Sequence, residues 1–111
     1  MKTNELTGAA LDWAVAKCDG VTEHSMGLWK LPILEACTSF QYSPSTNWAQ
    51  GGPIIEREEI ETRTAHSGGW MANRARTKGY FECGPTPLIA AMRCYGASKL
   101  GDNIDIPKEL T

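Results

Sequence analysis

The segment from residue 42 to residue 53 holds the densest collection of groups that could bind a ligand. Hydroxyl and amide side chains, a tryptophan and two adjacent glycines occur together there: Ser43, Ser45, Thr46, Asn47, Trp48, Gln50, Gly51 and Gly52. An indole can stack on a nucleobase, and glycines let the backbone approach a ligand closely. A short helix expected to begin at Pro53 would direct free N–H groups toward an anion. Arg57 on that helix, or Arg63, could then pair with a phosphate.

The same segment also has a purely structural interpretation. Serine and asparagine often cap turns, a tryptophan such as Trp48 can fill a core, and adjacent glycines permit a bend. The segment is not a P-loop, because no Lys-Ser or Lys-Thr pair follows the glycines. It is, however, longer than the roughly four to six residues that connect most elements. That excess length favours a functional role, and both interpretations stay open.

The spacing of residues along the sequence gives little support to a metal site or a catalytic site elsewhere in the chain. His24 and His66 have no cysteine or carboxylate partners at the spacing of a metal site. No local signature marks a Cys–His nucleophile pair. A carboxylate pair of the glycosidase kind is conceivable among Glu56, Glu58, Glu59 and Glu61, but a solvated charged face is the more common meaning of such a run. We therefore expect no catalytic residues, no metal and no cofactor.

The cysteines bear on the compartment in which the protein works. The four are Cys18, Cys37, Cys83 and Cys94, and no two form a CxxC pair. The first residues do not read as a signal peptide, so we expect a reducing, cytoplasmic environment and free thiols. No apolar run approaches the roughly 20 residues that span a bilayer, so we expect no membrane association.

Length and composition predict one folded domain covering residues 1–111. Hydrophobic residues make up 41% of the chain and charged residues 22%, which argues against global disorder. The net charge is −2, whereas a protein that coats extended nucleic acid needs a strongly basic face. Partners of that kind are therefore not expected.

Two helices are clearly indicated. The first covers residues 7–19, with Thr7 at its start and Gly20 after its end. The second covers residues 87–100, with Thr86 as its cap, Pro87 in its first turn and Gly101 at its stop. Both helices are apolar on more than one side, which predicts either burial between other elements or a homo-oligomer, most simply a dimer.

The remaining elements are shorter. Residues 60–64 and 70–74 alternate in the manner of a β-hairpin, with the turn at residues 66–69. Residues 21–40 suggest one or two short strands, residues 75–84 a polar loop held down by Tyr80 and Phe81, and residues 104–106 a terminal strand. The predicted fold is α+β, a small antiparallel sheet packed against helices 7–19 and 87–100.

Three blocks of the sequence resemble the phage NinX family. They are LTGAALDWAVA at residues 6–16, YSPSTNWAQGGPII at residues 42–55 and GPTPLIAAMR at residues 84–93. Together they cover roughly a third of the chain and extend over nearly its whole length. The resemblance implies an accessory product of lambdoid phages and related prophages, and it brings no catalytic residues with it.

Two functions are favoured by these observations, well ahead of a third, a hydrolase with a scattered active site. The first is a non-catalytic phage accessory protein that binds a small anionic, nucleotide-like ligand and so could sequester a host defence signal. The second is an interaction module that inhibits or redirects a host or phage protein through exposed Trp and Arg anchors. A concave position for Trp48, lined by Ser, Thr and Arg, favours the ligand, and a flat or convex position favours a protein partner.

Overall fold

The computed structural model describes residues 2–19, 22–23, 28–30, 40–41, 43–66, 68–75 and 81–101. Its helical elements are η1 (Thr3–Glu5), α1 (Gly8–Asp19), α2 (Trp48–Arg57) and α3 (Pro87–Leu100). Its strands are β1 (Thr22–Glu23), β2 (Leu28–Lys30), β3 (Phe40–Gln41), β4 (Ile60–Thr64), β5 (Trp70–Arg74) and β6 (Glu82–Gly84). The α+β class predicted from the sequence is confirmed.

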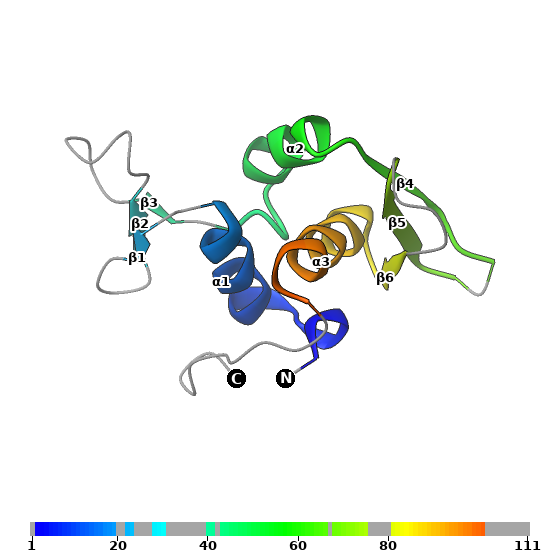
Figure 1. Ribbon diagram of the computed structural model, residues 1–111, viewed down its shortest axis with the longest axis horizontal. Helices are drawn as coiled ribbons and strands as arrows, with labels where there is room; N and C mark the ends of the chain where they lie inside the picture. The colour runs from blue at the N-terminus through cyan, green and yellow to red at the C-terminus, as the bar shows by residue number, and fades with distance from the viewer. Residues whose placement is uncertain are drawn as a thin grey trace.

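Helix α3 lies at the centre of the fold, with α1, α2 and the β4–β5–β6 sheet around it (Figure 1). Its bounds match the prediction for residues 87–100. The Thr86 side chain accepts a hydrogen bond from the Ile89 N–H, and Gly101 follows the helix with φ 83°, a conformation that favours glycine. Most of the helix is buried, namely Leu88, Ala90, Ala91, Met92, Cys94, Tyr95, Gly96 and Ala97. Ala90, Cys94 and Ala97, the small residues along one face of the helix, are therefore covered within the chain, so α3 no longer argues for a dimer.

The predicted hairpin is present and belongs to a three-stranded antiparallel sheet. Its register runs from Ile60 opposite Arg74 to Thr64 opposite Trp70. Gly68 and Gly69 both have positive φ in the turn. Ile60 and Ala72 are buried on one face of the sheet, and α3 contacts all three strands.

Strand β6 corrects the prediction of a polar loop over residues 75–84. Residues 82–84 pair antiparallel with β5. A Cβ on Gly84 would lie 2.8 Å from the Ala90 nitrogen, so only glycine allows this strand to lie so close to α3. Phe81 is 49% exposed and does not hold the segment down, and Tyr80 lies outside the described residues.

Helix α1 begins at Gly8, directly after Thr7, and packs against α3. Leu11, Ala14 and Val15 are fully buried on one apolar side of the helix, and Leu6, which precedes it, is fully buried as well. On its second side Ala16 is also fully buried, and Trp13 is partly buried against the core, with the Lys17 ammonium 5.0 Å from its ring centroid. Other parts of the same chain therefore cover much of both apolar sides of α1.

Helix α2 begins five residues earlier than predicted, at Trp48 rather than Pro53. Asn47 caps it, since its side-chain oxygen accepts a 2.9 Å hydrogen bond from the Ala49 N–H. Ile54 anchors it in the core at 2% exposure. Capping and burial outweigh the poor helix propensity of Gly51-Gly52-Pro53, so Pro53 lies inside the helix. The long loop that favoured a functional role is therefore only half as long as it seemed.

A second antiparallel sheet has the order β1–β2–β3. Strands β1 and β2 agree with the one or two short strands predicted over residues 21–40, and β3 begins at Phe40, at the end of that range. The predicted strand at residues 104–106, His24 and Cys37 lie outside the described residues.

Candidate functional site

The turn before α2 is held by its own polar groups. Gln50 Oε1 accepts a 2.6 Å hydrogen bond from the Ser43 N–H, and the Ser43 carbonyl accepts a 2.8 Å bond from the Asn47 N–H. Asn47 is occupied as the helix cap. Three of the predicted ligand-binding residues, Ser43, Asn47 and Gln50, therefore have a structural role in fixing this turn.

Ser45 connects the turn to α1 through Asp12, a residue not expected from the sequence to lie beside this segment. The Ser45 N–H donates a 2.9 Å hydrogen bond to Asp12 Oδ1, and both residues are buried. Burial raises the pKa of Asp12, and the Ser45 backbone N–H and hydroxyl partly oppose that shift. The Ser45 hydroxyl has no partner of good hydrogen-bond geometry among the described residues, although it lies near enough to the carboxylate to favour its charged form.

Asp12→Ala is expected to destabilise the fold by about 1–3 kcal/mol, because it leaves the buried Ser45 N–H without an acceptor. Asp12→Asn keeps an oxygen acceptor and removes a desolvated charge, so it should be neutral or stabilising at pH 7. The raised pKa means that the folded state holds the Asp12 proton more tightly, so stability falls as pH rises through that pKa. Melts at pH 7 and below about pH 4 test this: the advantage of Asn over Asp should disappear in acid.

A shallow hollow lies where α2 and α3 begin. It encloses about 210 Å³ and is lined by Ser45, Thr46, Trp48, Thr86, Pro87, Leu88 and Ile89. Trp48 is 56% exposed, so it does not fill the core. Three predicted site residues, Ser45, Thr46 and Trp48, thus come together, and the turn that caps α3 supplies the opposite wall. No local sequence pattern could have predicted that residues 45–48 and 86–89 lie side by side, because they are far apart in the chain and meet only in the tertiary structure.

The two glycines of α2 differ in their surroundings. Gly51 is buried, and a Cβ there would lie 2.5 Å from both Leu88 Cδ1 and the Pro44 carbonyl oxygen. Gly52 has nothing within 4 Å of the same position. Gly51 therefore permits close packing of α2 on α3 beside the hollow, and neither glycine is among the lining residues.

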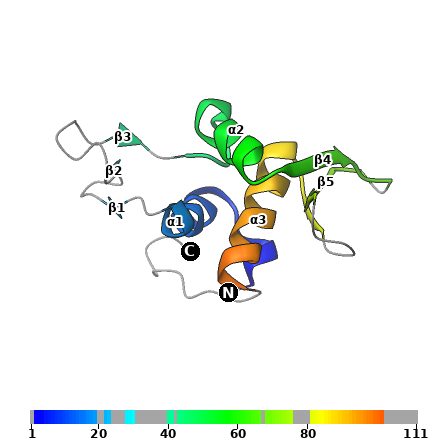
Figure 2. The ribbon, with the colours of Figure 1, turned by 45° about the horizontal axis from the view of Figure 1, so that its top comes forward.

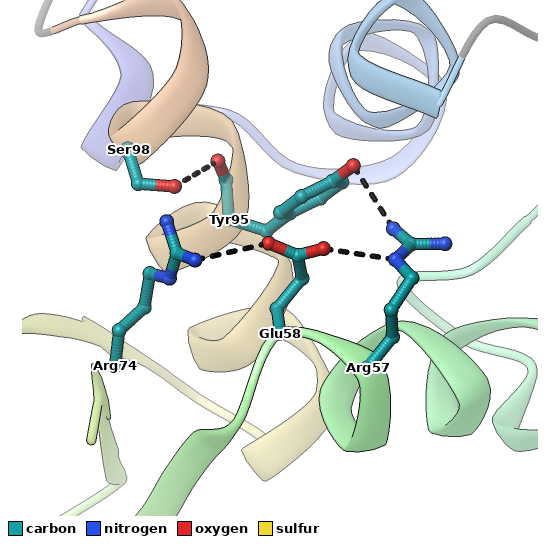
Figure 3. A network of polar contacts seen from close by, with 5 residues as sticks. All are labelled: Arg57, Glu58, Arg74, Tyr95 and Ser98. Carbon is teal, nitrogen blue, oxygen red and sulfur yellow. Dashed lines mark hydrogen bonds and ion pairs between the residues drawn. The ribbon is translucent and has the colours of Figure 1, made fainter. Parts of the chain in front are cut away.

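Arg57 is placed elsewhere, at the opposite end of α2 from Trp48. The nine residue steps from Trp48 to Arg57 correspond to roughly 13.5 Å along the helix axis. Arg57 Nε pairs with Glu58 Oε2 at 2.8 Å, and Arg57 Nη2 donates to the Tyr95 hydroxyl at 3.0 Å (Figure 3). Glu58 also pairs with Arg74 at 3.2 Å. This network ties the end of α2 to β5 and α3, and it leaves Arg57 outside the lining of the hollow.

The other candidate groups are dispersed over the part of the chain that the structure describes. His66 is exposed in the hairpin turn, and no group of three potential metal ligands occurs among the described residues. Cys83 and Cys94 are free thiols, and burial raises the pKa of Cys94 to about 11, which makes it a poor nucleophile. Glu58 departs from the predicted solvated face, because its side chain is only 12% exposed between two arginines.

The architecture is that of a small α+β domain with an open hollow at the starts of two helices. The family described as Bacteriophage P22, NinX matches residues 2–99, so the chain belongs to this family and is a phage accessory protein. The match extends well beyond the three blocks whose likeness was visible in the sequence. A comparison with curated proteins finds no match. None of the described helices is both long and apolar enough to cross a membrane.

Proposed function

We propose that the protein acts by binding rather than catalysis, and that the hollow at the starts of α2 and α3 holds the planar group of a small anionic, nucleotide-like ligand. The observation that carries this proposal is the position of Trp48, a large aromatic side chain 56% exposed on the wall of a hollow. Stacking on such a ring is sequence-tolerant, since every nucleobase offers a flat π-face.

The hollow suits one ring better than a whole ligand. Pockets that enclose drug-sized molecules have volumes of about 300–1,000 Å³, and this one encloses about 210 Å³. A base stacked on Trp48 would leave its sugar and phosphate at the rim. The Thr86 hydroxyl accepts from the Ile89 N–H but keeps its own O–H to donate to the ligand. The Thr46 hydroxyl donates to the Ser43 carbonyl at 3.5 Å and keeps its lone pairs to accept from the ligand.

Negative charge on the ligand is supported by the helix ends. Both α2 and α3 present their N-terminal residues, Trp48 and Pro87, to the hollow. The N-terminus of a helix carries a partial positive charge that favours anions. Since Arg57 is engaged at the other end of α2, we assign the attraction of the phosphate to these two helix starts instead.

Trp48→Ala should weaken binding about 5- to 150-fold, because stacking contributes about 1–3 kcal/mol. The melting temperature should change little, since the side chain is more than half exposed. Titration calorimetry with adenosine, guanosine, cytidine and uridine monophosphates and their nucleosides measures both the stacking and the phosphate contribution. Phe81→Ala is the matched control, because Phe81 is 49% exposed and does not line the hollow. Equal nucleotide affinities for Trp48→Ala and wild type would contradict the proposal.

A protein partner is the second candidate, and the character of the lining favours it. None of the seven lining residues is charged, and four of them, Trp48, Pro87, Leu88 and Ile89, are apolar. An exposed tryptophan beside an apolar depression resembles the anchor region of an interface. The same titration separates the two candidates. A hollow that binds a protein would show no measurable affinity for nucleotides or for nucleosides.

Sequestration follows if the ligand is a host signalling nucleotide. A phage protein that holds such a molecule removes it from solution without any chemical step, so affinity and copy number alone determine the effect. This role rests on the binding proposal above and on membership of a phage family.

A further inference from the structure

We infer that two copies of this chain associate by antiparallel pairing of their β4 strands, which joins two three-stranded sheets into one of six strands. Strand β4 is at the edge of its sheet, since the order is β4–β5–β6. Figures 1 and 2 show no described element beside its outer edge. Edge strands present unpaired backbone groups that can pair with another chain.

The hydrogen bonds at the two ends of the hairpin ladder fix which groups face outward. The Ala75 N–H donates to the Glu59 carbonyl, and the Ala65 N–H donates to the Gly69 carbonyl. Residues 59 and 65 therefore direct their backbone groups toward β5. Because this direction alternates along a strand, the N–H and C=O groups of Ile60, Thr62 and Thr64 point away from the sheet.

Only registers that place these outward residues opposite one another can form a ladder. Pairing centred on Thr62 uses all three, with Thr62 opposite Thr62 of the second copy and Ile60 opposite Thr64. It provides six backbone hydrogen bonds, two for each of the three pairs. Glu59, with φ 54°, turns the chain just before Ile60 and so limits the paired segment to the strand itself.

The side chains of β4 select the same register. With Thr62 at the centre, Glu61 lies opposite Arg63 of the second copy, and the two-fold symmetry repeats the pair. These are non-hydrogen-bonded positions, where side chains across the strands approach most closely. Shifting by one pair would place Glu61 opposite Glu61 or Arg63 opposite Arg63. The two neighbouring registers are therefore opposed by like charges.

Both charges are available for this contact. Glu61 and Arg63 are exposed and lie on the face of the sheet away from α3. Asn73 Nδ2 donates to Glu61 Oε2 at 3.0 Å from within the same copy, which leaves the other carboxylate oxygen for the arginine. The sequence Ile60-Glu61-Thr62-Arg63-Thr64 is thus self-complementary in charge about its own centre.

Sedimentation equilibrium of the full chain tests the inference. Wild type should dimerise, and Glu61→Arg or Arg63→Glu alone should weaken association at least about tenfold, because each turns two attractive pairs into two repulsive ones. An equimolar mixture of the two single variants should associate at least as tightly as wild type, because every pair across that heterodimer is again opposite in charge. The double variant Glu61→Arg with Arg63→Glu should likewise dimerise about as tightly as wild type, because its cross-strand pairs are again opposite in charge.

Thr62→Pro supplies an independent test of the backbone pairing. It removes an outward N–H that the folded monomer does not use, so the hairpin should survive while dimerisation is lost. Circular dichroism confirms folding in each variant. A wild-type chain that stays monomeric at millimolar concentration overturns the inference. So does a dimer whose dissociation constant is unchanged by both charge reversals.

Discussion

Replacing Met92 with aspartate is expected to leave the chain largely unfolded. Met92 is fully buried in the middle of α3, the helix that contacts the sheet, α1 and α2. A carboxylate there would lie among apolar neighbours, and such a change costs more than about 4 kcal/mol, against a total stability of about 5–15 kcal/mol for a domain.

Thermal and denaturant unfolding of Met92→Asp measure this effect directly. Met92→Leu is the control, since a swap of similar volume in a core usually costs less than about 1.5 kcal/mol. A melting temperature for Met92→Asp within a few degrees of wild type would mean that this face of α3 is not core.

The second large effect is expected at Gly51, with Gly52 as its neighbour and control. Gly51→Ala places a Cβ 2.5 Å from Leu88 Cδ1 and from the Pro44 carbonyl oxygen. The leucine can rotate, but the carbonyl belongs to the backbone, so α2 must move. We expect a loss of about 2–3 kcal/mol or more. Gly52→Ala meets nothing and should stabilise the helix by about 0.5–1 kcal/mol.

These neighbouring variants also connect packing to the hollow. Leu88 both contacts Gly51 and lines the hollow, so a displaced α2 would alter the distance between its walls. Gly51→Ala should therefore weaken binding as well as stability, and Gly52→Ala should leave binding unchanged. Equal melting temperatures for the two variants would contradict the packing described for α2.

Elements with local end signals could be predicted from the sequence. Helix α3 has a threonine cap, a proline in its first position and a glycine after its end, and its bounds were predicted correctly. The β4–β5 hairpin was predicted from its alternation and its paired glycines. In each case the information lies within a few residues of the element that it specifies.

Elements whose formation depends on distant contacts could not be predicted in the same way. The start of α2 was wrong because Gly51-Gly52-Pro53 disfavours a helix locally, whereas the buried Ile54 and the close contact with Leu88 favour one. Strand β6 was missed because its place depends on Gly84 lying against α3. Both errors arise where tertiary packing overrides local propensity.

The candidate site likewise has one part that could be predicted from the sequence and one part that could not. The sequence indicated Trp48 and the hydroxyl residues beside it, and the structure places Ser45, Thr46 and Trp48 on one hollow. It could not indicate the wall formed by residues 86–89 or the bond from Ser45 to Asp12. Arg57 looked close to Trp48 along the chain, but the length of a regular helix separates them.

Native mass spectrometry of the protein purified from phage-infected bacteria tests the central claim most directly. We expect wild type and Phe81→Ala to carry an added mass in the range of a small nucleotide, and Trp48→Ala, folded and of equal yield, to have lost it. Wild-type protein without any added small molecule, or the same added mass on Trp48→Ala, would contradict the assignment of the hollow as a nucleotide-binding site.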